Sequence, residues 1–140
     1  MSSGYPDYEG GKQRVYSTAD WAALVGKEKG FAASGLGLAY GDSTSVGYVV
    51  PPGKTLYLTH LSFTMHAAAE ADAELNQICE GRIRNAATGA AYWAQGGNGG
   101  GGITFPTPIP LVAGTSIDVM SVNWTNHVCN GRVSCSGYEV

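Results

Sequence analysis

The chain has 140 residues, of which 44% are hydrophobic and only 14% are charged, and its net charge is −3. This length suits one domain, and the charged fraction lies well below the usual value of about a quarter. No block of basic residues is present to neutralise phosphates, and no stretch approaches the ~20 apolar residues that span a bilayer. We therefore expect neither nucleic acid nor a membrane as a partner.

Residues 1–43 differ from the rest because their aromatic residues are spaced among glycines and charges. We expect an extended N-terminal arm with at most one short helix, which Ser17 or Thr18 caps and Gly26 ends. About two helical turns are unstable alone, so the helix must dock on this domain or on a neighbour. The alternative, an ordinary first layer of its own domain, stays open. The arm residues expected at an interface are Tyr5, Tyr8, Arg14, Tyr16 and Trp21.

From Thr44 onward, short apolar stretches alternate with turn residues. Within 56–66 and 77–85, apolar and polar residues alternate, which is typical of half-buried antiparallel strands. Residues 117–124 and 132–140 predict two further strands.

Turn signals separate these strands. Residues 52–53 (Pro-Gly) and 113–114 (Ala-Gly) each precede an apolar strand, and we interpret them as two equivalent corners of a two-sheet fold. Residues 130–131 (Asn-Gly) favour a hairpin turn. The glycine-rich run 96–102 predicts a flexible loop, or a place where the backbone passes close to another chain. The alternating prolines within 106–110 predict an edge strand or an extended crossing.

Seven or eight short strands at this turn spacing predict an all-β fold. The expected architecture is an antiparallel β-sandwich with jelly-roll-like connections. The predicted division is an arm over 1–43 and a β-sandwich domain over 44–140.

The histidines do not form a metal site by spacing. His60 and His66 share a strand face but lie roughly 20 Å apart at the rise of a strand. His127 and Cys129 fall short of a complete zinc ligand set. We expect no metal and no cofactor.

The three cysteines, Cys79, Cys129 and Cys135, are too few for a disulfide framework. We interpret them mainly as buried free thiols, while a single disulfide stays open. No spacing typical of a nucleophile with its base occurs, so we do not expect an enzyme.

Three polar or aromatic residues mark a candidate ligand or interface loop: Trp93, Asn98 and Trp124. The tryptophans suit stacking on sugar rings, or packing in a core or interface. Packing is the favoured interpretation.

Three segments, VPPGKTLYLTHLSF (50–63), GGITFPTPIPLVAGTSIDV (101–119) and CSGYEV (135–140), carry a family resemblance. They resemble small β-sandwich structural proteins of tailed bacteriophages, of the capsid decoration or cement type. The resemblance covers about residues 46–140 and supplies no catalytic residues.

The resemblance implies a virion structural protein that stabilises the shell through contacts between subunits. Its expected partners are other copies of itself, with a trimer favoured, and the major capsid protein or other virion proteins. The start of the chain lacks the pattern of a signal peptide, so we expect synthesis in the host cytoplasm and location on the virion. Two alternatives stay open: a receptor- or glycan-binding module, and a tail or fibre subunit.

Overall fold

The computed structural model describes residues 6–9, 12–15 and 27–140. The first two ranges form paired antiparallel strands, β1 (Pro6–Glu9) and β2 (Lys12–Val15), with Asp7 opposite Arg14 and Tyr8 opposite Gln13. The helix expected between Ser17 and Gly26 lies outside the described residues. So do three of the predicted interface residues, Tyr5, Tyr16 and Trp21.

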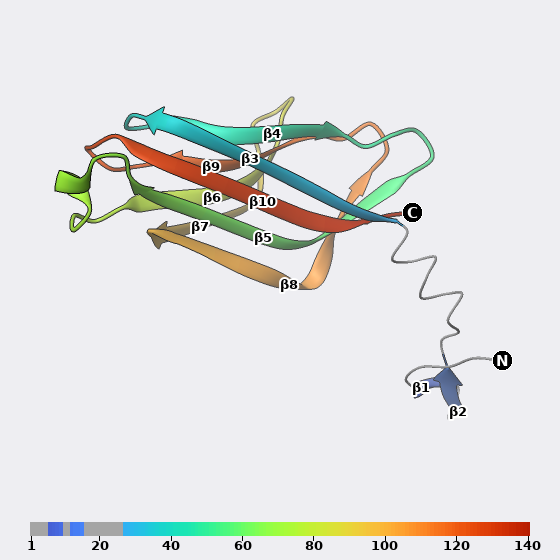
Figure 1. Cartoon of the computed structure of the whole chain (residues 1–140). Coiled ribbons are helices and arrows are strands. Elements are labelled where there is room, and N and C mark those ends of the chain that lie inside the picture. The colour runs from blue at the N-terminus through green and yellow to red at the C-terminus, as the bar shows by residue number, and fades with distance from the viewer. Residues whose placement is uncertain (1–5, 10–11, 16–26) are drawn as a thin grey trace.

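Two antiparallel four-stranded sheets pack against each other, which confirms the predicted β-sandwich (Figure 1). The first sheet has the order β3-β10-β5-β8 and the second has the order β4-β9-β6-β7. This strand order is that of an eight-stranded jelly roll. The strands are β3 (Glu28–Leu38), β4 (Ser43–Val49), β5 (Thr55–Ala67), β6 (Ile78–Asn85), β7 (Ala91–Asn98), β8 (Gly100–Val112), β9 (Ser116–Asn123) and β10 (Cys129–Glu139).

The sandwich begins at Glu28, so the boundary predicted after residue 43 falls inside it. Strand β3 pairs along its length with β10, and its Phe31 and Leu38 are buried in the core. Between them, the inward positions hold Ala33 and Gly35, which are too small to produce a visible apolar alternation. For this reason the sequence pattern predicts an arm where the structure has a strand.

The glycine-rich run 96–102 is not a flexible loop, because it lies in β7 and β8 around a tight turn at Gly99. Its glycines make room for the buried ring of Phe63. A Cβ added at Gly101 would lie 2.8 Å from that ring, and one added at Gly81 on β6 would lie 2.2 Å from it. The close backbone passage does occur, but it is made with β5 of the same chain, since a Cβ on Gly100 would lie 2.5 Å from the carbonyl oxygen of Phe63.

The predicted hairpin turn at 130–131 is wrong, because both residues lie inside β10 at an irregularity in its pairing with β3. A Cβ on Gly131 would lie 2.8 Å from the methyl group of Met65, so close packing explains this glycine. The chain turns earlier, between β9 and β10.

Of the two alternatives for the proline segment, the edge strand is confirmed. Strand β8 lies at the edge of the first sheet, and the pairing with β5 jumps from Ile109 to Thr104, which leaves 105–108 outside the register. Two of these four residues are prolines, which cannot donate to the ladder.

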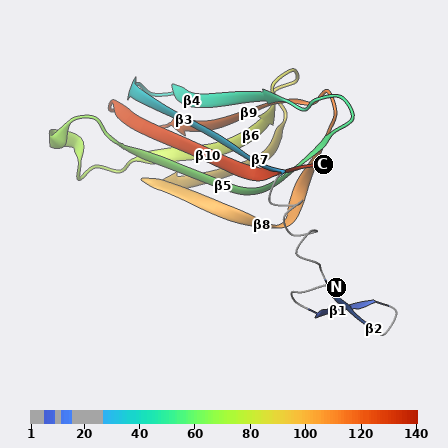
Figure 2. The ribbon, with the colours of Figure 1, turned by 45° about the vertical axis from the view of Figure 1, so that its right-hand side comes forward.

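The sandwich has two distinct ends (Figures 1 and 2). We call one the loop end, where the connections β3–β4, β5–β6, β7–β8 and β9–β10 gather at the left of Figure 1. We call the other the corner end, where β4–β5, β6–β7 and β8–β9 turn and where β3 begins and β10 finishes.

The two corners predicted from residues 52–53 and 113–114 are confirmed and lie against each other. The backbone N–H of Val50 donates to the carbonyl of Thr115 at 2.9 Å, and that of Gly114 donates to the carbonyl of Val50 at 2.8 Å. Gly53 and Gly114 both have positive φ, at 74° and 84°, which suits glycine in such turns.

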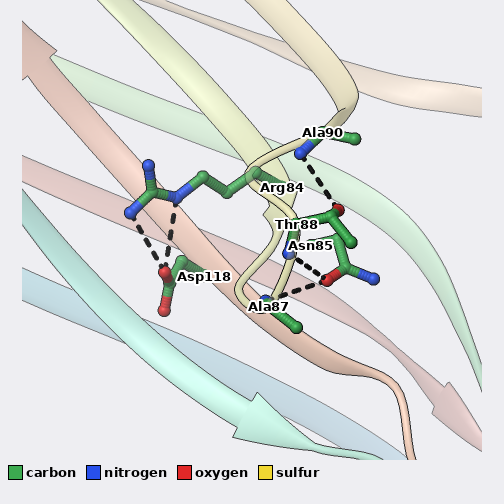
Figure 3. Close-up of polar contacts among 6 residues, drawn as sticks. All are labelled: Arg84, Asn85, Ala87, Thr88, Ala90 and Asp118. Carbon is green, nitrogen blue, oxygen red and sulfur yellow. Dashed lines mark hydrogen bonds and ion pairs between the residues drawn. The ribbon is translucent and has the colours of Figure 1, made fainter.

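The β6–β7 turn at the corner end is held by short-range side-chain bonds (Figure 3). The Asn85 side-chain oxygen accepts from the backbone N–H groups of Ala87 and Thr88, at 2.9 and 3.1 Å. Beside it, the guanidinium of Arg84 pairs with Asp118 of β9 at 3.3 Å. These contacts give the turn one fixed shape.

Among the described residues, helix is limited to the 3-10 turn η1 (Glu70–Asp72) in the β5–β6 connection. No helix there is long and apolar enough to cross a membrane.

Candidate interaction surface

Large apolar side chains are exposed at the loop end. Leu36 and Tyr40 have exposed fractions of 83% and 63%, which are high for residues of this size. The complete set, drawn from β3, β6 and three connections, is Leu36, Tyr40, Leu75, Ile78, Trp124 and Val128. Single exposed apolar residues are ordinary, but several at one end of a domain mark a candidate contact surface.

Tyr40 and Trp124 form an aromatic pair in this surface. Their ring centroids are 5.4 Å apart at an interplanar angle of 67°, which is an edge-to-face arrangement. The backbone on both sides is fixed: the N–H of Trp124 donates to the carbonyl of Ile78 at 2.9 Å, and that of Gly41 donates to the carbonyl of Asn123 at 2.7 Å. The pair therefore joins the β3–β4 and β9–β10 connections beside the start of β6.

The fully buried side chain of Asn123 cross-links the connections beneath this pair. Its amide nitrogen donates to the carbonyls of Leu38 and His127, at 2.8 and 3.1 Å. Its oxygen accepts from the backbone N–H and the hydroxyl of Thr125, at 2.9 and 2.6 Å. Because a buried amide with four partners has one favourable position, these bonds hold the loops in place.

Gln77, also buried, ties the β5–β6 connection to the same region. Its amide nitrogen donates to the carbonyl of Leu75 at 2.8 Å. Its oxygen lies 2.8 Å from Nε2 of His127 and 3.3 Å from the thiol sulfur of Cys129. Nε2 of His127 is thus used in a hydrogen bond that holds these connections together.

The loop end is acidic as well as apolar. Its connections carry four carboxylates, Asp42, Glu70, Asp72 and Glu74, and the described residues of these connections include no lysine or arginine. Asp42 is partly used locally, because its side chain accepts from the backbone N–H of Ala39 at 3.0 Å. A partner with basic residues at the rim of its contact surface would suit this end.

The predicted ligand loop of Trp93, Asn98 and Trp124 is not one site. Trp124 lies in the exposed surface, and Asn98 lies at the same end, where its oxygen accepts from the N–H of Gln77 at 2.8 Å. Trp93 packs against the core, with its ring centroid 5.3 Å from that of Phe105 in an edge-to-face contact. The two tryptophans therefore do not form a shared aromatic platform.

Sequence reasoning missed Tyr40 and Leu36 because they fell in the segment assigned to the arm. It also missed Asn123 and Gln77, whose roles depend on contacts between distant segments. One available signal was that Ser121 and Asn123 continue the inward phase of Ile117 and Val119, since polar residues at inward positions need partners.

The three cysteines are free and buried. Burial, with the neighbouring Cys129 thiol, raises the pKa of Cys79 to about 11. Burial raises the pKa of Cys135 to about 12. Both thiols are therefore protonated at neutral pH, whereas the nucleophilic form of cysteine is the thiolate.

His60 and His66 lie on the outward face of the first sheet, where Nδ1 of His60 is 3.2 Å from the hydroxyl oxygen of Thr104. Within the part of the chain that the structure describes, no three His, Cys, Asp or Glu side chains gather into a metal-binding group.

The sequence matches no known protein family, and no curated protein matches it. Segments 50–63, 101–119 and 135–140 meet at the corner end: Leu56 of the first and Leu111 of the second lie opposite each other, and Leu56 also lies opposite Glu139 of the third. These segments therefore form a structural corner, while the Tyr40–Trp124 pair lies at the loop end.

Proposed function

We propose that the chain is a virion structural protein, a capsid decoration subunit that stabilises a shell through contacts between subunits. The observation that supports this proposal is the exposed apolar surface of the loop end. Its partners are copies of this chain, in a trimer, and the shell protein beneath it. The virion context comes from the resemblance of the corner segments to phage structural proteins.

The construction of the loop end favours binding without rearrangement. Its connections are cross-linked by the buried side chains of Asn123 and Gln77. Side chains held in one arrangement before binding lose less conformational entropy when a partner covers them. The aromatic pair of Tyr40 and Trp124 supplies the kind of residue that dominates the energy of protein interfaces.

The test is the molar mass of the full-length protein by light scattering over a range of concentrations. We expect a trimer or larger assembly, and a double variant, Tyr40→Ala with Trp124→Ala, that dissociates at concentrations at least ~30-fold higher than the wild type. The matched control is Val49→Ala with Val112→Ala, which removes two exposed apolar side chains from the corner end and should leave the assembly unchanged.

If the wild-type protein is monomeric at every concentration, it is next mixed with purified capsid shells, and binding is measured by co-sedimentation. Binding that the loop-end variant loses supports attachment to the shell through this surface. A monomer that binds no shell, or an assembly equally weakened by the two double variants, contradicts the proposal.

A further inference from the structure

The outward face of the first sheet carries a shallow depression of about 220 Å³ over three adjacent strands. Strand β10 lies in the middle, between β3 and β5 (Figure 1). The side chains that line the depression on the outward phase are Ala32, Ser62, Thr64, Arg132 and Ser134.

The pairing of the strands sets the geometry of this site. Arg132 lies opposite Thr64 on one side and Ser34 on the other, and Ser134 lies opposite Ser62 and Ala32. Directly opposed residues in a sheet have Cβ atoms roughly 5 Å apart. The neighbours of Arg132 in the depression are therefore short hydroxyl side chains and the methyl group of Ala32.

Arg132 is exposed and takes part in none of the ion pairs or side-chain hydrogen bonds found within residues 27–140. The four strands of this sheet hold only two carboxylates, Glu28 and Glu139. Both lie at the corner end, and Glu139 accepts from the hydroxyl of Tyr48. Glu28 lies opposite Tyr138, six positions along β10 from Arg132, or roughly 20 Å at the rise of a strand. Within the four strands of this sheet, the positive charge of Arg132 thus has no carboxylate beside it.

The lining indicates the chemistry of a ligand. An arginine fork matches a carboxylate with two parallel hydrogen bonds, and one guanidinium balances one negative charge. The backbone N–H groups of these strands are used in the sheet, so they do not form the amide cradle that often supplements arginine around a phosphate. The serine and threonine hydroxyls can donate to and accept from the hydroxyls of a sugar ring.

The size of the depression also suits a small ligand. Its volume is below the ~300 Å³ at which pockets for drug-sized ligands begin, which suits one ring and its substituents. We infer that this face binds a carboxylated sugar unit, with the carboxylate on Arg132 and the ring hydroxyls on Ser62, Thr64 and Ser134. This site is separate from the loop end and does not rest on the proposed role in assembly.

The test is a titration of the ¹⁵N-labelled full-length protein, followed by the NMR shifts of its amide groups. Three probes separate the parts of the ligand: galacturonate carries a carboxylate and ring hydroxyls, galactose carries only the hydroxyls, and acetate carries only the carboxylate. We expect galacturonate to bind with a dissociation constant of ~1 mM, about tenfold or more tighter than either of the others. The shifts should centre on Ser62, Thr64, Arg132 and Ser134.

Three variants complete the test. Arg132→Gln should weaken galacturonate binding by about tenfold or more, whereas Arg82→Gln should leave it unchanged, because Arg82 lies on the second sheet and pairs with Glu80. If Arg132→Gln does not fold, Ser134→Val should weaken binding of galacturonate but not of acetate. Galacturonate that binds no tighter than acetate, equal binding by Arg132→Gln, or shifts centred elsewhere would overturn the inference.

Discussion

The two ends of the sandwich are built on different principles. At the corner end the turns bond to one another through their backbones, as Val50 does with Thr115 and Gly114, and polar side chains pair between strands, as Arg84 does with Asp118. At the loop end, side chains hidden below the surface fix the connections, while large apolar groups such as Leu36 and Tyr40 remain in solvent. The most recognisable sequence motifs of this chain therefore lie at the corner end and serve the fold, whereas the candidate interaction surface lies at the loop end.

The largest expected effect is a loss of folding, and a pair of truncations tests it. Together they show where in the sequence the domain begins. Deleting residues 1–40 removes β3 with Phe31 and Leu38 and exposes the backbone of β10. Losing two buried apolar side chains costs ~2–5 kcal/mol each, which approaches the whole stability of a small domain. We expect this truncated protein not to fold, as measured by circular dichroism and NMR.

The matched truncation removes residues 1–26 and leaves both sheets and the described core intact. It should fold with a melting temperature within a few degrees of the full chain. Unfolding of this shorter deletion would mean that the arm supplies core contacts, and the domain would then begin before β3.

The corner end could be predicted from the sequence, whereas much of the loop end could not. Alternation of apolar residues in 56–66 and the turns at 52–53 and 113–114 predicted the sandwich and its corners, because these signals are local. Strand β3 was missed because its inward positions include Ala33 and Gly35, and the run 96–102 was misread because its glycines serve Phe63, far away in sequence. The candidate surface depends on Asn123 and Gln77, whose partners come from separate connections. A short stretch of sequence therefore cannot predict it.

A glycine at the corner end should be far less replaceable than a glycine beside it. In Gly137→Ala the new Cβ would lie 2.1 Å from the carbonyl oxygen of Tyr57, and this backbone atom cannot swing aside. We expect a loss of ~3 kcal/mol in the free energy of unfolding, measured by urea denaturation. Gly30→Ala is the control in the neighbouring strand, because a Cβ there has nothing within 4 Å and should change stability by less than ~1 kcal/mol. Equal losses would show that backbone contact does not govern this end.

At the loop end, the buried amide network is predicted to control both stability and shape. Asn123→Ala removes the buried side-chain partner of the Leu38 carbonyl and of the Thr125 backbone N–H, and we expect a loss of ~2–3 kcal/mol. Asn126→Ala, an exposed asparagine in the same connection, should change stability by less than ~0.5 kcal/mol. Hydrogen exchange should also quicken around residues 39–42 in the first variant only. Unchanged exchange there would mean that the loops are held by something other than Asn123.

The smallest expected effect is a pH dependence at the corner end, where Tyr48 of β4 donates to Glu139 of β10 and so joins the two sheets. This hydrogen bond, with burial and the charge of Glu139, raises the pKa of Tyr48 from 10.0 to about 12. Because the folded state favours the protonated phenol, the stabilisation is complete below pH 10 and is lost as the pH rises from 10 to 12. The contact is partly exposed, so we expect no more than ~1 kcal/mol. Urea denaturation between pH 8 and 11.5 should show a steeper loss of stability for the wild type than for Tyr48→Phe, which lacks the hydroxyl. Parallel curves would mean that packing between the sheets, and not this bond, closes the corner end.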